Sequence, residues 1–289
     1  MDEIVTLVDD HALASLFDQA STFLPNQLVF LSSRNSLLRQ IVSIYLIIGI
    51  GGTVLYFFLA SLSYFVFFVV WREKYHPATE PQPFKGQEIQ EIRMSLRSIP
   101  TMAHLTVPFL LGEINGYSKL YNRLDDYGGW PYLILSLILF IFWSDTLIYW
   151  IHRGLHEIPW MYKYIHKDHH KWKVPTPFAA IAFHPFDGWL QSTPYHIFPY
   201  LIPMNKWLSL IAFVGVQVWT VLIHDGVHWT PFEFVNGAAH HTFHHLKFHY
   251  NYGQFFTFWD RWAGTHMSPF TVYDPEKKSF ISTRYGDKG

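Results

Sequence analysis

The sequence contains no cysteine in its 289 residues. This absence excludes disulfides, cysteine-ligated iron–sulfur clusters, thiolate-bound haem and cysteine zinc fingers. Charge is scarce as well, since Asp, Glu, Lys and Arg make up 15% of the chain, against roughly 25% in an ordinary soluble domain. The formal net charge is −1, so the chain lacks the basic surface that nucleic-acid binding requires. We therefore expect no nucleic-acid partner.

Long apolar runs are present instead. Residues 41–71 contain no charged residue, and a bilayer core about 30 Å thick is crossed by roughly 20 apolar residues in a helix. Residues 128–151 form a second strong run, with Trp130 and Trp150 near its ends as in an interfacial aromatic belt. Both segments are predicted to span a membrane.

Two further segments are weaker candidates. Residues 98–112 are short and contain two prolines. Between Gly188 and Ile223 the only charged residue is Lys206, and the sequence FPYLIPMNKW at the midpoint predicts a turn between two helices. We expect a helical hairpin over residues 188–223 and four helices entering the membrane in all.

Basic residues predict the orientation. The loop after the first span has more of them than the segment before it, which carries only Arg34 and Arg39. The positive-inside rule places that loop in the cytosol, and counting spans then brings His152 and His224 to the same face. The basic residues of the loop are Arg72, Lys74, Lys85, Arg93 and Arg97.

The expected domains are a lumenal N-terminal segment (1–40), transmembrane helices (41–151) and a histidine-rich catalytic region (152–289) that includes the hairpin 188–223.

Histidine is the most informative residue type. The chain has 18 histidines, and most follow the second strong span in four clusters with helical spacings of i,i+4 or i,i+3,i+4. On a helix such residues share one face, with Cβ atoms roughly 5–6 Å apart. A pair can therefore offer two imidazoles to one metal ion, or one to each of two adjacent ions. The clustered residues are His152, His156, His166, His169, His170, His224, His228, His241, His244 and His245.

Ten imidazoles are too many for one ion and fit two ions with about five each. Carboxylates are nearly absent from the clusters, unlike the Glu-rich pattern of soluble di-iron bundles, and a bis-histidine haem fits badly. We therefore expect an all-α fold. It would be a multi-span membrane helical bundle with a cytosolic, histidine-rich di-metal helical cap, and no catalytic residue is expected beyond the metal centre.

The isolated histidines are interpreted as solvated surface residues: His11, His76, His104, His196 and His266.

Two aspartates lie close to the histidines. Asp145 lies in an apolar span, seven residues before His152 and on nearly the same helical face. An ionisable group at membrane depth is costly and often functional, so Asp145 is expected to accept the ring N–H of a ligand histidine. The alternative is a capping or interfacial aspartate, and Asp225 beside His224 has the same two interpretations.

The apolar surroundings predict a lipid substrate. A metal pair could act on it through O₂ chemistry or, as zinc, through hydrolysis, and the residue pattern does not choose between them. A metal transporter is the alternative from another class. A transporter needs its histidines and acids distributed through the spans, whereas these gather at one side.

Four stretches resemble a known superfamily: DTLIYWIHRGLH, YIHKDHHKWKVPTPFAAIAFHPFDGWLQSTPYHIFPYLIP, WTVLIHDGVH, and NGAAHHTFHH followed by NYGQFFTFWDRWAG. The histidine motifs are similar to those of the fatty acid hydroxylase/sterol desaturase superfamily. The motifs HKWKVPTPFA, AFHPFDGWLQ and NYGQFFTFWD resemble the sterol C-5 desaturases, or lathosterol oxidases, within it. The first span, with LYFFLASLSYFVFF, also resembles that branch.

The resemblance implies an endoplasmic reticulum enzyme with a di-iron centre facing the cytosol. It would introduce the C5=C6 double bond into a Δ7-sterol, using O₂ and electrons from cytochrome b5 and its NAD(P)H-dependent reductase. The clustered histidines would be the iron ligands, with His184 and His240 behind them or facing the substrate. His228 departs from the aromatic residue expected there, and is either a tenth ligand or a local substitution. A related lipid hydroxylase or sterol C-4 methyl oxidase is the alternative, because only the family motifs favour desaturation.

Overall fold

The computed structural model describes residues 13–23, 36–78, 81–227, 232–269, 271–274 and 279–282, together with Val8 and Ser33. The architecture is helical, as expected. The long helices are α4 (Leu37–Tyr64), extended by a π-helical segment η3 (Phe65–Val70), α6 (Gln87–Ile114), α7 (Gly129–Glu157), α9 (Pro185–Leu201) and α10 (Lys206–His224). The short helices are α2 (Ala14–Phe23), α5 (Arg72–Tyr75), α8 (Pro159–Met161), α11 (Ala238–Lys247) and α12 (Phe258–Trp262).

Short π and 3-10 segments and two small sheets complete the described residues. The helical segments are η4 (Leu124–Tyr127), η5 (Tyr162–His166), η6 (His169–Lys171) and η7 (Pro177–Ile181). Strands β1 (Leu120–Tyr121) and β2 (Met204–Asn205) pair in parallel, and β3 (Thr271–Asp274) pairs antiparallel with β4 (Ser279–Ser282).

Three helices in the described part of the chain are long and apolar enough to cross a membrane: Leu37–Val70, Gly129–Glu157 and Lys206–His224. These agree with the two strong spans and the second arm of the hairpin. Residues 98–112 instead form the second half of α6, whose first half is charged, and α9 is a 17-residue helix interrupted by Pro194 and Pro199. These two helices pack among the three spans.

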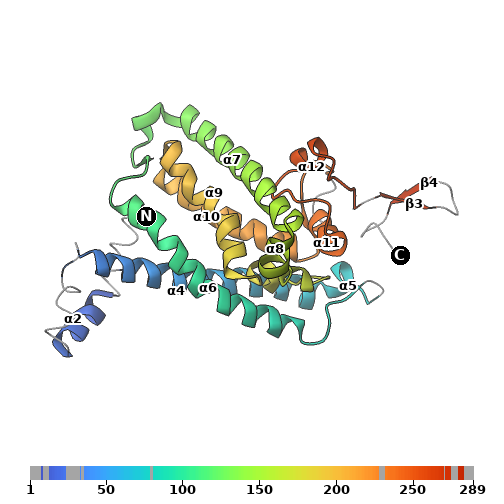
Figure 1. Cartoon of the computed structure of the whole chain (residues 1–289), viewed down its shortest axis with the longest axis horizontal. Helices are drawn as coiled ribbons and strands as arrows, with labels where there is room; N and C mark the ends of the chain where they lie inside the picture. Colours follow the sequence, from blue (N-terminus) through green and yellow to red (C-terminus); the bar gives the residue numbers. More distant parts are fainter. Residues whose placement is uncertain are drawn as a thin grey trace.

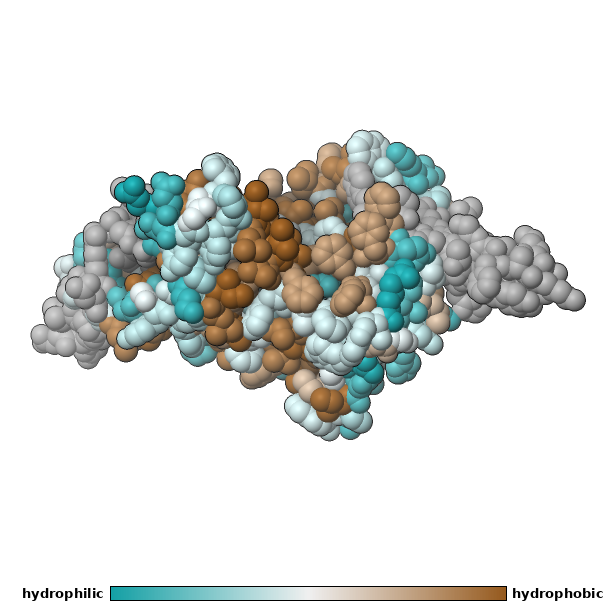
Figure 2. All heavy atoms as spheres, turned by 90° about the horizontal axis from the view of Figure 1, so that it is seen from above, coloured by the Kyte–Doolittle hydropathy of each residue, from teal (hydrophilic) through white to brown (hydrophobic). Residues whose placement is uncertain are grey.

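The outer surface of the spans is apolar. Large apolar side chains at Ile50, Val54, Phe58 and Leu62 on α4 are all at least half exposed. Their spacing of four residues places them on one face of the helix. Figure 2 shows hydrophobic residues gathered over the middle of one face of the molecule, with the most hydrophilic residues lying to either side of them. A face of this kind is expected to contact lipid.

The bundle brings the histidine-bearing segments to one end (Figure 1). The principal core lies between α7, α9 and α10, where Phe140, Phe198 and Val216 are buried. The turn between α9 and α10 is the expected hairpin turn, because Asn205 caps α10 by accepting from the N–H of Trp207 at 3.0 Å. Chain direction therefore reverses at the end of the bundle opposite the histidines.

A polar stripe on α6 holds the segment that follows the second histidine motif. The stripe consists of Gln87, Glu91, Ser95 and Ser98, all buried and all on one helical face. Gln87 Nε2 donates to the carbonyl of Val174 at 2.8 Å, and Glu91 accepts from both the N–H and the hydroxyl of Thr176. Ser95 and Ser98 donate to carbonyls farther along the same segment. Helix α6 thus fixes the backbone beside the histidines.

Glu91 gives this contact a pH dependence. Burial raises the pKa of Glu91 from its ordinary 4.5 to about 7. The folded protein therefore binds a proton that the unfolded chain releases between these values, and stability falls as pH rises from about 4.5 to 7, by about 3 kcal/mol from this group. We expect the pH profile of thermal unfolding in detergent to lose this slope in Glu91→Gln. The variant Glu73→Gln, at an exposed carboxylate, is the matched control, and an unchanged slope in Glu91→Gln would contradict the assignment.

Candidate metal centre

Two groups of buried histidines lie side by side at the end of the bundle where α7, α8 and α11 meet (Figure 1). In each group the ring nitrogens that could bind a metal lie within 4.8 Å of one another. We name the larger group set 1 and the smaller group set 2. Set 1 consists of His152, His156, His166, His170 and His244, and set 2 of His169, His224, His241 and His245.

The spacing within each motif decides which set a histidine joins. Histidines four residues apart join the same set, as His152 and His156 do, and those at i+3 join the other set, as His169 and His244 do. Successive helix residues are rotated by about 100°, so i+3 and i+4 point to opposite sides of residue i. The second motif divides its histidines between the two sets in the same way, although it forms a π-turn followed by a 3-10 turn and not the single α-helix expected.

Hydrogen bonds orient five of the nine rings from behind. In each case Nδ1 faces an acceptor, which is a backbone carbonyl for four rings and a carboxylate for the fifth. The pairs are His152 with Tyr252 O (3.0 Å), His169 with Ala182 O (3.4 Å), His224 with Thr220 O (2.7 Å), His244 with Tyr250 O (2.7 Å) and His166 with Asp187 Oδ2 (2.6 Å). Because a carbonyl only accepts, Nδ1 carries the proton and Nε2 keeps its lone pair.

The free lone pairs converge, which is the arrangement that a metal ion requires. Nε2 of His152 and Nε2 of His244 are buried without a hydrogen-bond partner among the described residues. Nε2 of His170 lies 3.0 Å from Nε2 of both His156 and His166, and one N–H cannot serve both acceptors. In set 2, Nε2 of His224 lies 3.0 Å from that of His241. The donors therefore fit metal ions that bind imidazole.

Burial also keeps the histidines outside the spans neutral. It lowers the pKa of His244 to about 3 and shifts the pKa values of His169, His170, His241 and His245 well below the ordinary 6.5, with neighbouring imidazoles lowering the latter four further. Only neutral imidazole binds a metal. The two sets adjoin one another, with the rings of His169 and His245 4.6 Å apart and those of His170 and His245 4.9 Å apart. The arrangement can therefore hold two neighbouring ions.

The structure brings together nine of the ten histidines expected as ligands. The tenth, His228, lies outside the described residues. Sets of five and four agree with the expectation of about five imidazoles for each ion. As expected, α7 continues past the span to carry His152 and His156, and it ends at Glu157 just before Pro159.

The role expected for Asp145 is wrong. Its Oδ1 accepts the backbone N–H groups of Phe255 (2.7 Å) and Phe256 (3.2 Å), not a histidine ring. Asp145 thus fixes the loop that carries the Tyr252 carbonyl. Asp225 likewise accepts from the N–H of Val227 at 2.8 Å and from the Ser63 hydroxyl, so it stabilises the end of α10.

Asp187 has the role that was expected of Asp145, and sequence reasoning missed it. It is fully buried, its Oδ2 faces His166 Nδ1, and its Oδ1 accepts from Gln191 Nε2 at 2.7 Å. Two features of the sequence could have indicated this role. Asp187 lies in the motif AFHPFDGWLQ, and it is a carboxylate four residues before a glutamine in an apolar helix.

Other histidines differ from expectation. His184 caps α9, since its Nδ1 accepts from the N–H of Phe186 at 3.3 Å, so it supports no ligand ring. His76 and His196 are buried, against the expectation that they are solvated. His104 is exposed as expected, and His11 lies outside the described residues.

His240 belongs to a third polar group with Glu233 and His266. Its Nε2 lies 3.9 Å from Glu233 Oε2, and that oxygen is already 3.3 Å from the guanidinium of Arg261. A cation next to the carboxylate disfavours a metal ion there. The group is therefore a network that ties α11 to α12, and His240 is not directed toward either histidine set.

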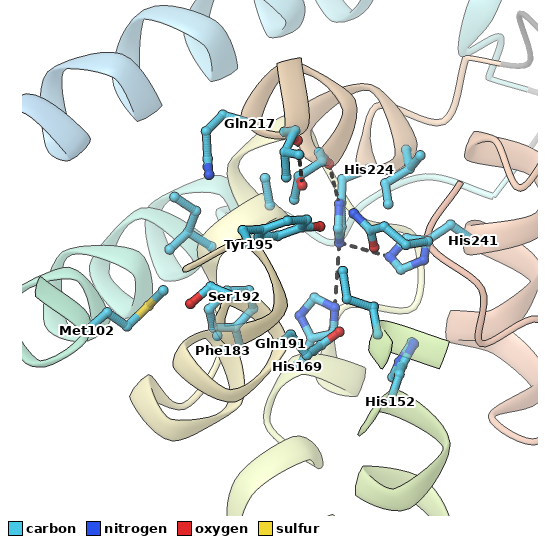
Figure 3. A pocket seen from close by; sticks show the side chains of 18 of the residues that line it. Met102, His152, His169, Phe183, Gln191, Ser192, Tyr195, Gln217, His224 and His241 are labelled. Atoms are coloured by element: carbon cyan, nitrogen blue, oxygen red, sulfur yellow. Dashed lines mark hydrogen bonds between the residues drawn. The ribbon is translucent and has the colours of Figure 1, made fainter. Parts of the chain in front are cut away.

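An apolar cavity adjoins both sets. It is lined by His152 of set 1 and by His169, His224 and His241 of set 2 (Figure 3). Apolar side chains on α7, α10 and the segment before α9 make up much of the remaining wall, including Ile148, Phe183, Val216 and Ile223, and polar side chains of α9 and α10 complete it. At Gly188 an added Cβ would lie 2.0 Å from the Phe183 ring, so glycine allows this ring to pack against α9. The cavity fits an apolar molecule that reaches both sets.

The comparisons with known proteins agree with this geometry. The family model described as fatty acid hydroxylase matches residues 137–265. The Δ7-sterol 5(6)-desaturase ERG3B of Gibberella zeae is 45% identical, over 95% of this chain and 92% of its own length. The lathosterol oxidase of Rattus norvegicus is 48% identical, over 86% of this chain and 82% of its own. A Δ7-sterol 5(6)-desaturase of Schizosaccharomyces pombe is 48% identical, over 83% of this chain and 71% of its own. No solved structure matches the chain.

Proposed function

Because the chain belongs to the family of Δ7-sterol 5(6)-desaturases and lathosterol oxidases, we propose that its two histidine sets bind two iron ions and that the adjoining cavity holds the sterol. The chain is an oxidoreductase of sterol biosynthesis that introduces the C5=C6 double bond into a Δ7-sterol. The observation that carries the proposal is the pair of adjacent sets of neutral, buried imidazoles opening on an apolar cavity.

Iron is proposed because desaturation is a redox reaction and zinc has no redox chemistry. When bound, iron would couple the loss of two hydrogens from the sterol, together with two electrons from a donor and two protons from solvent, to the reduction of O₂ to two waters. The nine histidines would be its ligands, with His228 proposed as the tenth. The carbonyls behind His152, His224 and His244 hold the rings so that Nε2 points inward.

Residues around the cavity exclude water and orient the sterol. Phe183, Ile148 and Val216 cover its walls with apolar surface, which favours the ring system of a sterol over water. The cavity contacts histidines of both sets, so a sterol edge seated there would present adjacent C–H bonds to the metal centre. Two neighbouring hydrogens must be removed for a double bond, and this placement suits their removal from one face.

The experiment that tests the function is an assay on membranes containing the protein. Incubation with a Δ7-sterol, O₂ and NADH is expected to produce a 5,7-diene, which has a conjugated ultraviolet absorbance. A hydroxylated sterol lacks that absorbance, so hydroxylation as the only product would contradict the desaturase assignment. Chelation of iron should abolish product formation, and readdition of ferrous iron should restore it.

Cytochrome b5, fed by an NAD(P)H-dependent reductase, is the proposed electron donor. The exposed surface around the second histidine motif carries a net positive charge, because Lys163, Lys167 and Lys171 are exposed there against the single exposed acid Asp168. None of these three lysines forms an ion pair with a described residue, and Lys171 lies over the ring of Trp172. A basic surface beside the metal centre favours a donor with an acidic docking face.

Charge reversal tests this surface. In the triple variant Lys163→Glu, Lys167→Glu and Lys171→Glu, cytochrome b5 is expected to reduce the iron centre about 10-fold more slowly than in the wild type at low ionic strength. The difference in rate between variant and wild type should shrink at high salt. Stopped-flow reduction kinetics measure the effect. Lys119→Glu is the control, because this exposed residue precedes the opposite end of α7. Equal rates for the triple variant and the wild type at low salt would exclude this docking face.

We further propose that the protein resides in the endoplasmic reticulum membrane with the metal centre facing the cytosol. The basic loop after the first span supports this orientation, because its His76 packs against Gly226 beside the end of α10, near the metal centre. On this view residues 1–40 are lumenal, 41–151 hold the transmembrane helices, and 152–289 form the catalytic region with the hairpin 188–223.

A further inference from the structure

One face of α9 lines the cavity with polar groups that the reaction does not need as metal ligands. Gly188, Gln191, Ser192 and Tyr195 all line the cavity. Their spacing of i, i+3, i+4 and i+7 is that of a single helical face. Ser192 is already engaged, since its hydroxyl donates to the carbonyl of Trp189 at 2.8 Å. Gln191 and Tyr195 remain as the groups on this face that can bind a ligand.

Gln191 offers an acceptor to the cavity. Its Nε2 donates to Asp187 Oδ1 at 2.7 Å, and Asp187 is fully buried and held by His166. This bond fixes which end of the amide faces the aspartate, because a carboxylate only accepts. The carbonyl oxygen Oε1 is therefore the end of Gln191 that can bind a molecule in the cavity.

Tyr195 offers a donor. Its side chain is largely buried and lines the cavity, and its hydroxyl forms no hydrogen bond with a described residue. Figure 3 shows this hydroxyl on the side of the cavity that faces His224. A phenol hydroxyl can donate one hydrogen bond. Because this one lines the cavity and makes no bond to the protein, it is available to donate to a molecule bound there.

We propose that Gln191 and Tyr195 together bind the 3β-hydroxyl of the sterol, with Gln191 Oε1 accepting its proton and the Tyr195 hydroxyl donating to its oxygen. This inference rests on the proposed function. The 3β-hydroxyl is the only polar group of a simple Δ7-sterol, and it is both a donor and an acceptor, as this pair requires. The apolar walls offer no group that recognises this hydroxyl, whereas this pair does.

The position of the pair agrees with the site of reaction. Three bonds of about 1.5 Å separate the hydroxyl oxygen from C5, so the group that binds this hydroxyl must lie close to the metal centre. Tyr195 faces His224, and Gln191 is joined to His166 through Asp187. Binding the hydroxyl here would place C5 and C6, rather than the side-chain end, next to the histidines.

The test compares three sterols that yield the same ultraviolet readout: the 3β-hydroxy Δ7-sterol, its 3-ketone, which keeps the acceptor oxygen but lacks the O–H, and the 3-deoxy compound. In the wild type, kcat/KM is expected to fall about 10-fold to 100-fold from the hydroxy sterol to the deoxy sterol. In Tyr195→Phe, kcat/KM should fall about 10-fold for the hydroxy sterol and for the ketone, and should equal the wild-type value for the deoxy sterol. Gln191→Leu should lose a similar factor on the hydroxy sterol only.

Ser192→Ala is the matched control on the same helical face, and it should keep the wild-type ratios among the three sterols. Equal losses on all three sterols for Tyr195→Phe and Gln191→Leu would show a structural role and overturn the inference. Selective loss in Gln217→Leu or Gln254→Leu instead would overturn it as well, because both side chains also line the cavity. A wild-type protein that forms the diene with no preference for the hydroxyl refutes this inference alone, whereas one that forms no diene refutes the proposed function.

Discussion

Changing His169 or His244 to alanine is expected to abolish formation of the 5,7-diene and to lower bound iron. The two residues belong to different sets, His244 to set 1 and His169 to set 2. In each ring Nδ1 donates a hydrogen bond to a backbone carbonyl, and this bond fixes the ring so that Nε2 points inward. Changing a group that merely supports a ligand already costs about 10-fold to 100-fold, so loss of the ligand itself should exceed about 100-fold. Turnover and iron per chain, measured on purified protein, check this expectation.

The control is His104→Ala, because His104 is an exposed histidine on α6 away from both sets. It should retain iron and activity. Normal iron content and turnover in either His169→Ala or His244→Ala would refute the di-metal assignment. If both variants lose about half of the iron, the two sets bind separate ions. If each loses all of it, the ions bind cooperatively.

The histidine motifs could be predicted from the sequence because helical spacing is a local property. Clusters at i,i+3,i+4 place imidazoles on one face wherever the helix lies, and nine of the ten expected residues meet. The spacing also divides the rings of one motif between two sets, but which motifs contribute to the same set depends on tertiary packing and could not be read in this way. The second motif combines a π-turn and a 3-10 turn, and the turn geometry there depends on packing against the rest of the cap.

The supporting aspartate was misassigned for a physical reason. The cost of a charge at membrane depth predicts that Asp145 has a hydrogen-bond partner. It has two, the N–H groups of Phe255 and Phe256. Sequence alone does not reveal which donors a buried carboxylate will meet. The pairing of Asp187 with His166 depends on how α9 packs against the π-turn of residues 162–166, which is a tertiary property.

The polar stripe of α6 was likewise hidden in the sequence. Its first half lies in the segment after the first span, whose basic residues predict a cytosolic loop and do not indicate a buried helix face. The structure shows a helix from Gln87 whose buried polar face binds carbonyls and a hydroxyl of residues 174–183, a segment that includes η7. Such complementarity between distant segments has no signature in either segment alone.

Removing the carboxylate of Asp187 is the second change expected to have a large effect. In Asp187→Ala, His166 Nδ1 loses its acceptor in a fully buried site, so neither the orientation nor the tautomer of the ring is held. Groups in this position typically contribute about 10-fold to 100-fold to metal affinity or activity. We expect iron to be lost to a chelator at 10-fold to 100-fold lower chelator concentration, with turnover falling in proportion to the iron that remains.

Two further variants separate this role from the binding of the sterol hydroxyl. Asp187→Asn keeps an oxygen that can accept from His166, so its iron retention should lie between those of the wild type and Asp187→Ala. Gln191→Leu removes the other hydrogen bond to the same carboxylate but leaves the acceptor for His166 in place, so its iron retention should stay within about 2-fold of the wild type. Both changes remove the hydrogen bond between Asp187 and Gln191, and only Asp187→Ala also removes the contact with His166. Equal iron loss in the two variants would therefore mean that Asp187 serves the packing of α9.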